Sequence, residues 1–376
     1  MTTWLEQQAA VRERRGLTRT PGVRGPRDGM VDLAGNDYLG LATDPRLAEV
    51  AGEAADRWGT GATSSRLVAG TTELHMELEH ELAGLVGADA ALVFSSGYLA
   101  NLGIITSLGG PGTLIVADEH CHASMIDGFR LSRSETATFR HNDASHAGSL
   151  LQGRTQPRAL VVVESIYSVG GDAAPLDDLL GLAEEHDAVL LVDDAHGLGV
   201  AGSDAFSGRG SIAGTALAGH PNVVVTATLS KALGSQGGVV LGSALVREHL
   251  VNRSRSFIFD TALAPPAAAA ALAAVGIIRK EPWRAAAVHR NAARLAAHLE
   301  LEPTAGAVQT LRMPSAEAAV AASRAAAVAG VRVGCFRPPS VPDGTSRLRL
   351  TSHAGLTPDH LDHACAVLRH ILEETP

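Results

Sequence analysis

The chain alternates between short apolar runs and segments in which apolar residues recur at helical spacing. The apolar runs are rich in β-branched residues, as expected of strands that are buried on both faces of a parallel sheet. They lie at residues 91–94, 113–116, 160–163, 189–192, 223–225 and 239–241. Between such runs, residues 72–84 place Leu74, Leu78 and Leu82 on one helical stripe, and residues 176–186 behave similarly. The pattern predicts a large, open α/β domain with ligands at the carboxyl ends of its strands.

The pattern changes near residues 265–266, where two prolines introduce Ala-rich helical segments. The last hundred or so residues then resemble a small, separate α+β unit. We therefore predict an N-terminal segment at 1–45, a large α/β domain at 46–265 and a small C-terminal α+β domain at 266–376.

Composition narrows the class of function. The 376 residues carry a net charge of −9 without a dense basic run, which argues against a nucleic-acid partner. No apolar stretch is long and unbroken enough to predict a membrane span. The three cysteines have no metal-ligand spacing, so we expect reduced thiols in a cytoplasmic protein and no metal site.

Lysine is almost absent from the chain, and one of the two lysines stands out. Among 31 basic residues only Lys231 and Lys280 are lysines. Lys231 lies between the strands predicted at 223–225 and 239–241, where burial would lower the pKa of its amine and leave a nucleophile able to form a Schiff base. The alternative is a compositional bias that replaced lysine by arginine and spared Lys231.

Polar residues follow two of the predicted strands. Ser96, Gly97 and Tyr98 open a helix after residues 91–94, and the free amides of a helix N-terminus bind anions such as phosphate. Asp193 follows residues 189–192, where a carboxylate could hold a proton on a heterocyclic nitrogen. An ordinary turn, a helix N-cap or a metal ligand are the alternatives for these positions.

Three further candidates complete this set. His122 could stack on a flat ring and shuttle protons, and Ser168 could donate a hydrogen bond to a ligand oxygen. Residues 347–351 alternate like a strand that puts Arg349 and Thr351 on one face, where an arginine could bind a carboxylate. A packed histidine, a turn serine and an exposed edge strand are the structural alternatives. Together, the candidates make up the parts needed to bind pyridoxal phosphate and use it as an electron sink.

In their order and combination, these motifs resemble those of the α-oxoamine synthases. This family comprises fold-type-I pyridoxal-phosphate enzymes that condense an amino acid with an acyl-CoA and release CO2. The resemblance implies an aspartate-aminotransferase-like transferase fold, with a large, mostly parallel-sheet domain and a small C-terminal α+β domain. The matching stretches are Asn36-Asp37-Tyr38-Leu39-Gly40-Leu41, Ser65-Arg66-Leu67-Val68-Ala69-Gly70, Ser96-Gly97-Tyr98, His122-Ala123-Ser124, Val192-Asp193-Asp194-Ala195-His196-Gly197, Thr228-Leu229-Ser230-Lys231-Ala232-Leu233-Gly234 and Arg349-Leu350-Thr351.

The resemblance also implies a role for each site residue. Lys231 would bond the cofactor and act in catalysis, with Asp193 at the pyridine nitrogen and His196 at the ring hydroxyl. The other cofactor-binding residues would be His122, stacked on the ring and a candidate catalytic group, then Ser96, Gly97, Tyr98 and Thr228 at the phosphate, Ser168 nearby, and Thr261 reaching the phosphate of a partner subunit. The substrate side would hold Arg19, Asn36, Arg349 and Thr351. The family often has an arginine directly after a leucine of the N-terminal segment; here Thr18 follows Leu17, and Arg19 comes one position later.

Residues 336–351 indicate which substrates to expect. They are most similar to family members that use L-alanine and pimeloyl-CoA, or a carrier-protein thioester. Glycine-using members, such as glycine C-acetyltransferase and 5-aminolevulinate synthase, are the alternative, with serine palmitoyltransferase, an aminotransferase of the same fold and a non-catalytic anion-binding protein as further rivals. The resemblance implies a homodimer with sites at the interface, small-molecule substrates, and neither nucleic acid nor membrane as partner.

Overall fold

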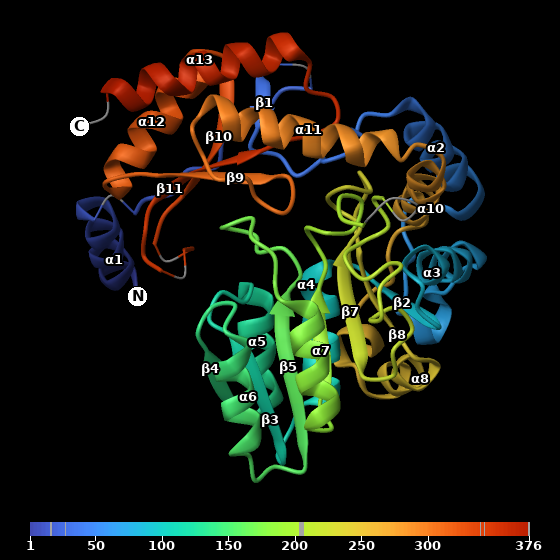
Figure 1. Ribbon diagram of the computed structural model, residues 1–376. Helices are drawn as coiled ribbons and strands as arrows, with labels where there is room; N and C mark the ends of the chain where they lie inside the picture. Colours follow the sequence, from blue (N-terminus) through green and yellow to red (C-terminus); the bar gives the residue numbers. More distant parts are fainter. Residues whose placement is uncertain (16, 27, 203–206, 339, 342, 375–376) are drawn as a thin grey trace.

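The protein is described by a computed structural model that covers residues 1–15, 17–26, 28–202, 207–338, 340–341 and 343–374. Pro339 and Pro342 of the 336–351 motif lie outside these residues. The chain forms a larger lobe around one sheet and a smaller lobe around another, and the parallel strands of the larger sheet end toward the smaller lobe (Figure 1).

The larger sheet has seven strands in the order β2-β8-β7-β6-β5-β3-β4. From β3 to β7 all strands are parallel, whereas β8 runs antiparallel to both of its neighbours. Their bounds are β2 Ala90–Phe94, β3 Thr113–Asp118, β4 Glu135–Phe139, β5 Arg158–Glu164, β6 Val189–Asp193, β7 Val223–Thr228 and β8 Gly238–Gly242. The mostly parallel sheet confirms the predicted α/β fold class.

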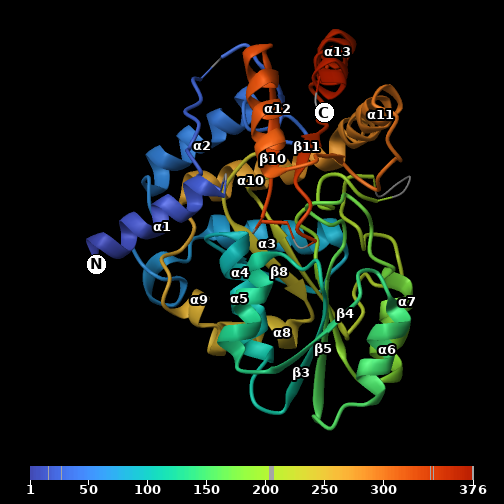
Figure 2. The same ribbon diagram turned by 90° about the vertical axis from the view of Figure 1, so that its left-hand side faces the viewer.

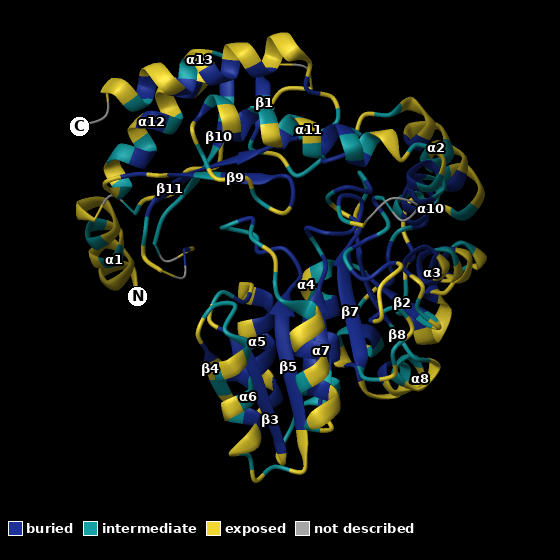
Figure 3. Cartoon of the chain, in the orientation of Figure 1, coloured by how far each residue is buried: buried dark blue, intermediate teal, exposed yellow. Residues whose placement is uncertain are grey.

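Helices cover both faces of this sheet and bury it. Along β5, Val161 and Val163 join one core while Leu160 and Val162 join the other, so successive side chains point to opposite, equally apolar faces. The first core includes α3 (Glu73–Val86), α6 (Ala144–Gln152), α7 (Leu176–Glu185) and α10 (Pro265–Lys280). The second includes α4 (Gly97–Leu108), α5 (Ala123–Ser132), α8 (Ala244–Arg253) and α9 (Arg255–Ile258). Figure 3 shows the buried strands between helices with exposed outer faces.

The smaller sheet joins both ends of the chain in the order β1-β10-β11-β9. β1 (Val31–Leu33) pairs in parallel with β10 (Val331–Phe336), while β11 (Arg347–Thr351) is antiparallel to β10 and to β9 (Val308–Arg312). A third core joins this sheet to α11 (Trp283–His298), α12 (Ala316–Val328) and α13 (Pro358–Glu374). Because β11 lies between two strands, it is not an exposed edge strand.

The domain boundaries predicted at residues 45 and 265 remain a prediction. Two observations bear on where such boundaries fall. β1 belongs to the smaller sheet although it lies near the N-terminus, and α10 packs against α2 (Pro45–Trp58) and α3 in the larger lobe. The helix α1 (Thr2–Arg14) lies apart from both sheets and has no buried residue (Figure 2).

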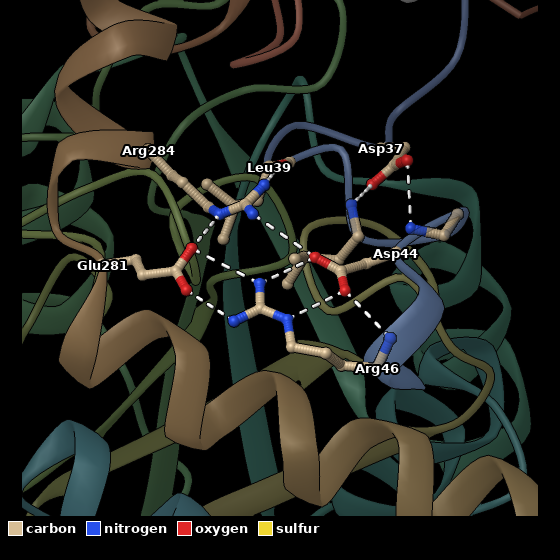
Figure 4. A network of polar contacts seen from close by, with 8 residues as sticks. Asp37, Leu39, Asp44, Arg46, Glu281 and Arg284 are labelled. Atoms are coloured by element: carbon tan, nitrogen blue, oxygen red, sulfur yellow. Dashed lines mark hydrogen bonds and ion pairs between the residues drawn. The ribbon is translucent and has the colours of Figure 1, made fainter. Parts of the chain in front are cut away.

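A network of charged side chains holds the loop between β1 and α2 (Figure 4). Arg284, at the start of α11, donates to the carbonyl of Leu39 at 2.7 Å and pairs with Asp44 and Glu281. Arg46 pairs with the same two carboxylates. The network therefore ties the loop that carries Asn36 and Tyr38 to the junction of α10 and α11.

Candidate active site

Two neighbouring cavities lie at the carboxyl ends of the parallel strands. The inner cavity, of about 260 Å³, is lined by residues that include Ser96, Asp193 and Thr228. The outer cavity, of about 470 Å³, is lined by residues that include Asn36 and Arg349. Three residues line both cavities, namely His122, His196 and Lys231. The candidates from strand ends far apart in the sequence therefore meet in one place, as predicted.

Lys231 lies in the turn after β7, with its Nζ 2.8 Å from Nε2 of His196. Burial lowers the pKa of the Lys231 amine to about 8, although the carboxyl groups of Asp193 and Glu164 act in the opposite direction. The neutral amine, the form that a nucleophile or a base requires, is therefore far more abundant near neutral pH than in an ordinary lysine.

His196 connects Lys231 to a buried tyrosine. Its Nδ1 lies 2.6 Å from the hydroxyl of Tyr38, which also donates to Oδ1 of Asn36 at 3.1 Å. Burial, and next the charge of Lys231, lower the pKa of His196 well below its ordinary value, so the ring is neutral. Burial raises the pKa of Tyr38 to about 12, so its phenol keeps its proton. Tyr38 thus orients the neutral imidazole that contacts Lys231.

Asp193 ends β6 and faces the inner cavity. Its Oδ2 accepts a hydrogen bond from Nδ2 of Asn101 at 2.8 Å, and its Oδ1 accepts one from the backbone of Ala195 at 3.0 Å. Asn101 also donates to Ser124, whose hydroxyl lies 2.7 Å from Nδ1 of His122. A continuous polar chain therefore runs from the carboxylate to His122, whose pKa is lowered by burial.

Asp194, the next residue, has a different surrounding. It accepts hydrogen bonds from the hydroxyl of Ser165 at 2.6 Å and from the backbone of Ser211 at 3.0 Å. These contacts brace the turn after β6. Of the two adjacent aspartates, Asp193 is thus the one available to a ligand in the inner cavity.

The residues of the predicted anion cradle lie together at the start of α4. Ser96 caps the helix by accepting a hydrogen bond from the backbone of Leu99, and Thr228 lies opposite, 2.6 Å from the hydroxyl of Ser230. A Cβ added to Gly97 would lie 3.0 Å from Cβ of Thr228, so glycine permits this close approach. Tyr98 lines the cavity but is half-exposed, and its hydroxyl binds Asp127.

The outer cavity contains the predicted substrate-side arginine. Arg349 is 3% exposed and donates to the carbonyl of Ser168 at 2.7 Å, and to Asn36 and Thr351 at 3.0 Å each. Its guanidinium also lies over the ring of Phe336. Thr351 is fully buried, so its contact with Arg349 is the route by which it can influence a ligand.

Two predicted residues lie farther from the cavities. Arg19 is exposed and donates to the hydroxyl of Ser340, a residue that lines the outer cavity, at 2.7 Å. Thr261 is exposed and forms an isolated bridge with Ser65. Neither side chain lines the two cavities in the described part of the chain.

Four residues with notable contacts had no role in the sequence interpretation: Tyr38, Asn101, Glu164 and Ser230. Glu164 ends β5 and stands in register with Asp193 on β6, and it lines the inner cavity. An acidic residue directly after an apolar run was the signal for Asp193, and the same signal marks Glu164. Asn101 lies within a helix, where no such signal exists.

The described residues hold neither a metal-binding cluster nor a membrane-spanning helix. Among them, no group of three or more His, Cys, Asp or Glu side chains could hold a metal ion. None of their helices is long and apolar enough to cross a membrane.

Known proteins resemble this chain in sequence and in structure. The model of the family described as aminotransferase class I and II matches residues 28–368. The chain belongs to this family. The match to this family confirms the predicted fold type. The two cavities therefore belong to a member of an enzyme family.

Within this family, the chain is most informatively compared with three proteins. A relative from Mycobacterium ulcerans named 8-amino-7-oxononanoate synthase is 50% identical over 98% of this chain and 94% of its own length. A solved structure of SPT (serine palmitoyltransferase) with PLP is 30% identical, with a TM-score of 0.91 over 100% of this chain and 99% of that one. The 8-amino-7-oxononanoate synthase of Francisella tularensis is 26% identical, with a TM-score of 0.78 over 92% of this chain and 98% of that one. These comparisons confirm the predicted family resemblance.

Proposed function

We propose that the protein is an 8-amino-7-oxononanoate synthase. It condenses L-alanine with pimeloyl-CoA, or with a pimeloyl carrier-protein thioester, and releases CO2. The cofactor is pyridoxal phosphate. The observation that carries the proposal is the shared cavity wall in which Lys231 meets His196, with Asp193 on one side and Arg349 on the other. The 50% identity to a named synthase supports the same assignment.

The residues of the inner cavity fit this cofactor. The N-terminus of α4, with Ser96 as its cap and Gly97 close to Thr228, suits a phosphate group. Asp193 has the chemistry to keep a proton on a pyridine nitrogen, and the buried Lys231 amine can bond an aldehyde carbon. His196 is a neutral hydrogen-bonding partner for a ring hydroxyl.

The side chains divide the work of the reaction. Pyridoxal phosphate supplies, when bound, the electron sink that stabilises a carbanion at Cα of the amino acid. Lys231, once its amine is free, accepts the Cα proton and returns a proton at the end of the reaction. Arg349 binds the substrate carboxylate from the outer cavity, with Asn36 and Thr351 fixing its guanidinium. His122 covers the inner cavity and can donate a hydrogen bond to the developing ketone oxygen.

We further propose that two copies associate and that the enzyme is cytoplasmic. Large apolar side chains are exposed on neighbouring elements: Leu67 and Val68 in the π-helix η1 (Arg66–Gly70), Tyr98 at the start of α4, and Phe259 after α9. Thr261 lies in the same region, which supports a role toward a partner's site. The three free cysteines are in keeping with a reducing compartment.

The test is product analysis by mass spectrometry. Purified, cofactor-loaded protein is mixed with pimeloyl-CoA and either L-alanine or glycine. The proposal expects 8-amino-7-oxononanoate with L-alanine and little product with glycine. Because the solved SPT structure superposes closely, a parallel reaction contains L-serine and palmitoyl-CoA. A further reaction contains glycine and acetyl-CoA or succinyl-CoA. CoA release only in that reaction, or only in the one with L-serine and palmitoyl-CoA, would assign the protein to a sibling activity.

A further inference from the structure

Glu164 is a buried acid in the inner cavity to which the proposed reaction assigns no task. Its side chain lies at the end of β5, and the residue is 2% exposed. Its Oε2 accepts a hydrogen bond from the backbone of Ser168 at 3.0 Å, whereas Oε1 is buried without a hydrogen-bond partner among the described residues. Both Glu164 and its register neighbour Asp193 line the same cavity.

We propose that Glu164 is a positioning residue that stays a neutral carboxylic acid and donates a hydrogen bond from Oε1 to an oxygen of the ligand in the inner cavity. The inference rests on the proposed function only in assuming that pyridoxal phosphate binds there. The acceptor is either the ring hydroxyl oxygen of the cofactor or the carboxylate of the amino acid, since both are oxygen acceptors that this cavity admits.

A second buried glutamate, Glu79, provides a comparison for the protonation state of Glu164. Glu79 is 3% exposed, and its carboxylate pairs with the guanidinium groups of Arg66 at 2.8 Å and Arg247 at 3.2 Å. Glu164 has the backbone N–H and the nearby hydroxyl of Ser168 instead, and it stands beside another carboxyl group. A buried carboxylate without a cation at hydrogen-bond distance is costly, so the acid keeps its proton.

The surrounding charges agree with this protonation state. Burial raises the pKa of Glu164, and the charge of Asp193 raises it further; the Ser168 N–H and the charge of Lys231 act in the opposite direction without cancelling the rise. The titratable groups near Glu164 come from several elements, namely Tyr38 after β1, Cys121 after β3, Tyr167 after β5, Asp193 in β6 and Lys231 after β7, while His122 and His196 line the same cavity. A neutral Glu164 leaves Asp193 as the one carboxylate among the described residues that line the inner cavity.

Glu164 is also connected to the substrate side of the site. The backbone of Ser168 joins the two side chains. Its N–H donates to Glu164, and its carbonyl accepts a hydrogen bond from Arg349. A change at Glu164 can therefore reach the arginine that binds the substrate carboxylate. For this reason the experiment must separate binding of the cofactor from binding of the amino acid.

The experiment titrates the protein freed of cofactor with pyridoxal phosphate, and follows the visible absorbance of the lysine–cofactor bond from pH 6 to 10. Glu164→Gln keeps a donor and an acceptor and carries no charge. We expect it to bind cofactor within about twofold of the unmodified protein, with the absorbance midpoint moved by less than about 0.3 of a pH unit. Glu164→Leu removes the donor and should weaken one ligand about tenfold. Titration with L-alanine decides which: weaker cofactor binding identifies the ring oxygen, and weaker alanine binding identifies the carboxylate.

One result would overturn the inference. If Glu164 is ionised, Glu164→Gln removes a negative charge near Lys231, and the absorbance midpoint should fall by about one pH unit or more. This outcome can be read from the Gln variant alone, even where the Leu variant fails to fold. Glu79→Gln is the matched control, expected to lower thermal stability and to leave the absorbance titration unchanged. No product needs to form, so a failure of the synthase assay would be distinguishable from a failure of this inference.

Discussion

At the residue scale, the site depends on burial, which lowers the pKa of the Lys231 amine to about 8 and keeps the His196 imidazole neutral. The Lys231 amine lies against a neutral His196, and Tyr38 orients that imidazole from the other side. Without this lowered pKa, Lys231 would be almost entirely charged near neutral pH and therefore a poor base. The chain's shortage of lysine also supplies an unusually clean test, because only one other lysine exists.

Lys231→Ala should reduce the rate of product formation by at least about 100-fold, since proton transfer alone contributes about 10² to 10⁴ to such reactions. Turnover of pimeloyl-CoA and L-alanine measures the loss, and borohydride reduction followed by peptide mapping should label Lys231 in the unmodified protein only. Lys280→Ala, at the exposed end of α10, should keep both activity and label. Activity retained by Lys231→Ala would refute the assignment.

Residues of the site could be predicted from sequence where a local signal marks them. Asp193 ends an apolar strand, and Ser96 and His122 lie within a few residues of the ends of two others, which is where a parallel sheet presents its ligand-binding side chains. Tyr38 gave no such signal, because its partner His196 lies 158 residues away, and Asn101 lies 92 residues from Asp193. Contacts of this kind follow from the packing of lobes and helices rather than from any local pattern.

At the element scale, the network around Arg284 holds the Asn36–Tyr38 loop against the junction of α10 and α11. Arg284 has a side chain that is 14% exposed and contacts Leu39, Asp44 and Glu281. Removing it leaves the Leu39 carbonyl without its charged donor. Both stability and substrate binding should therefore respond to this position.

Arg284→Ala should lower the free energy of unfolding by about 1–3 kcal/mol and raise the KM for L-alanine. Chemical denaturation measures the first effect and initial rates the second. The control is Arg294→Ala, which removes a more exposed ion pair with Asp362 and should cost no more than about 1 kcal/mol without changing KM. Equal losses in the two variants would contradict the proposed bracing of the loop.

A second set of polar contacts at this scale, between His141 and two aspartates, should stabilise the fold in a pH-dependent way. His141, after β4, lies between Asp118 at 2.9 Å and Asp172 at 2.7 Å, and so joins the end of β3 to the loop that carries Ser168. Burial alone would lower the pKa of His141, but the hydrogen bonds and charges of the two aspartates raise it to about 9. Because the folded-state pKa lies above the ordinary value of about 6.5, the stabilisation is complete below that value and is lost as pH rises through about 9.

We expect the stability advantage of the unmodified protein over His141→Gln to be on the order of 1–3 kcal/mol at pH 6, and to fall by pH 10 to the part that the ring contacts of His141 contribute. Denaturant unfolding of both proteins across this range measures the difference. An advantage that stays constant with pH would show that His141 acts through packing alone. Its ring does stack on His120 and contact Tyr167, so the Gln variant also reports that pH-independent part.

The strands of the larger sheet were predictable to different degrees. The central strands are apolar on both faces and appear as runs in the sequence. β4 was missed because it is an edge strand whose residues, from Glu135 onward, are mostly exposed and polar. β1 was missed because three residues carry too little pattern, and its partner β10 lies 300 residues away in register.

At the scale of the whole molecule, the exposed apolar groups near the inner cavity favour association of two copies. Val68→Asp should shift the protein toward monomer in sedimentation velocity, since Val68 is 81% exposed beside Leu67 and near Phe259. Val328→Asp, at a 91% exposed position on α12, is the matched control and should not change the sedimentation coefficient. A protein that already sediments as a monomer at micromolar concentration would contradict the proposal.

The pairing of β1 with β10 has a consequence for synthesis on the ribosome. Val31 emerges early, yet its register partner Val331 is added 300 residues later, roughly 15–60 s afterwards at 5–20 residues per second. Asn36 and Tyr38 follow β1 directly, so the nascent chain cannot fix them against His196 and Arg349 until that strand is docked. The larger sheet can fold as it is translated, but the candidate active site is completed only after β10 has been translated.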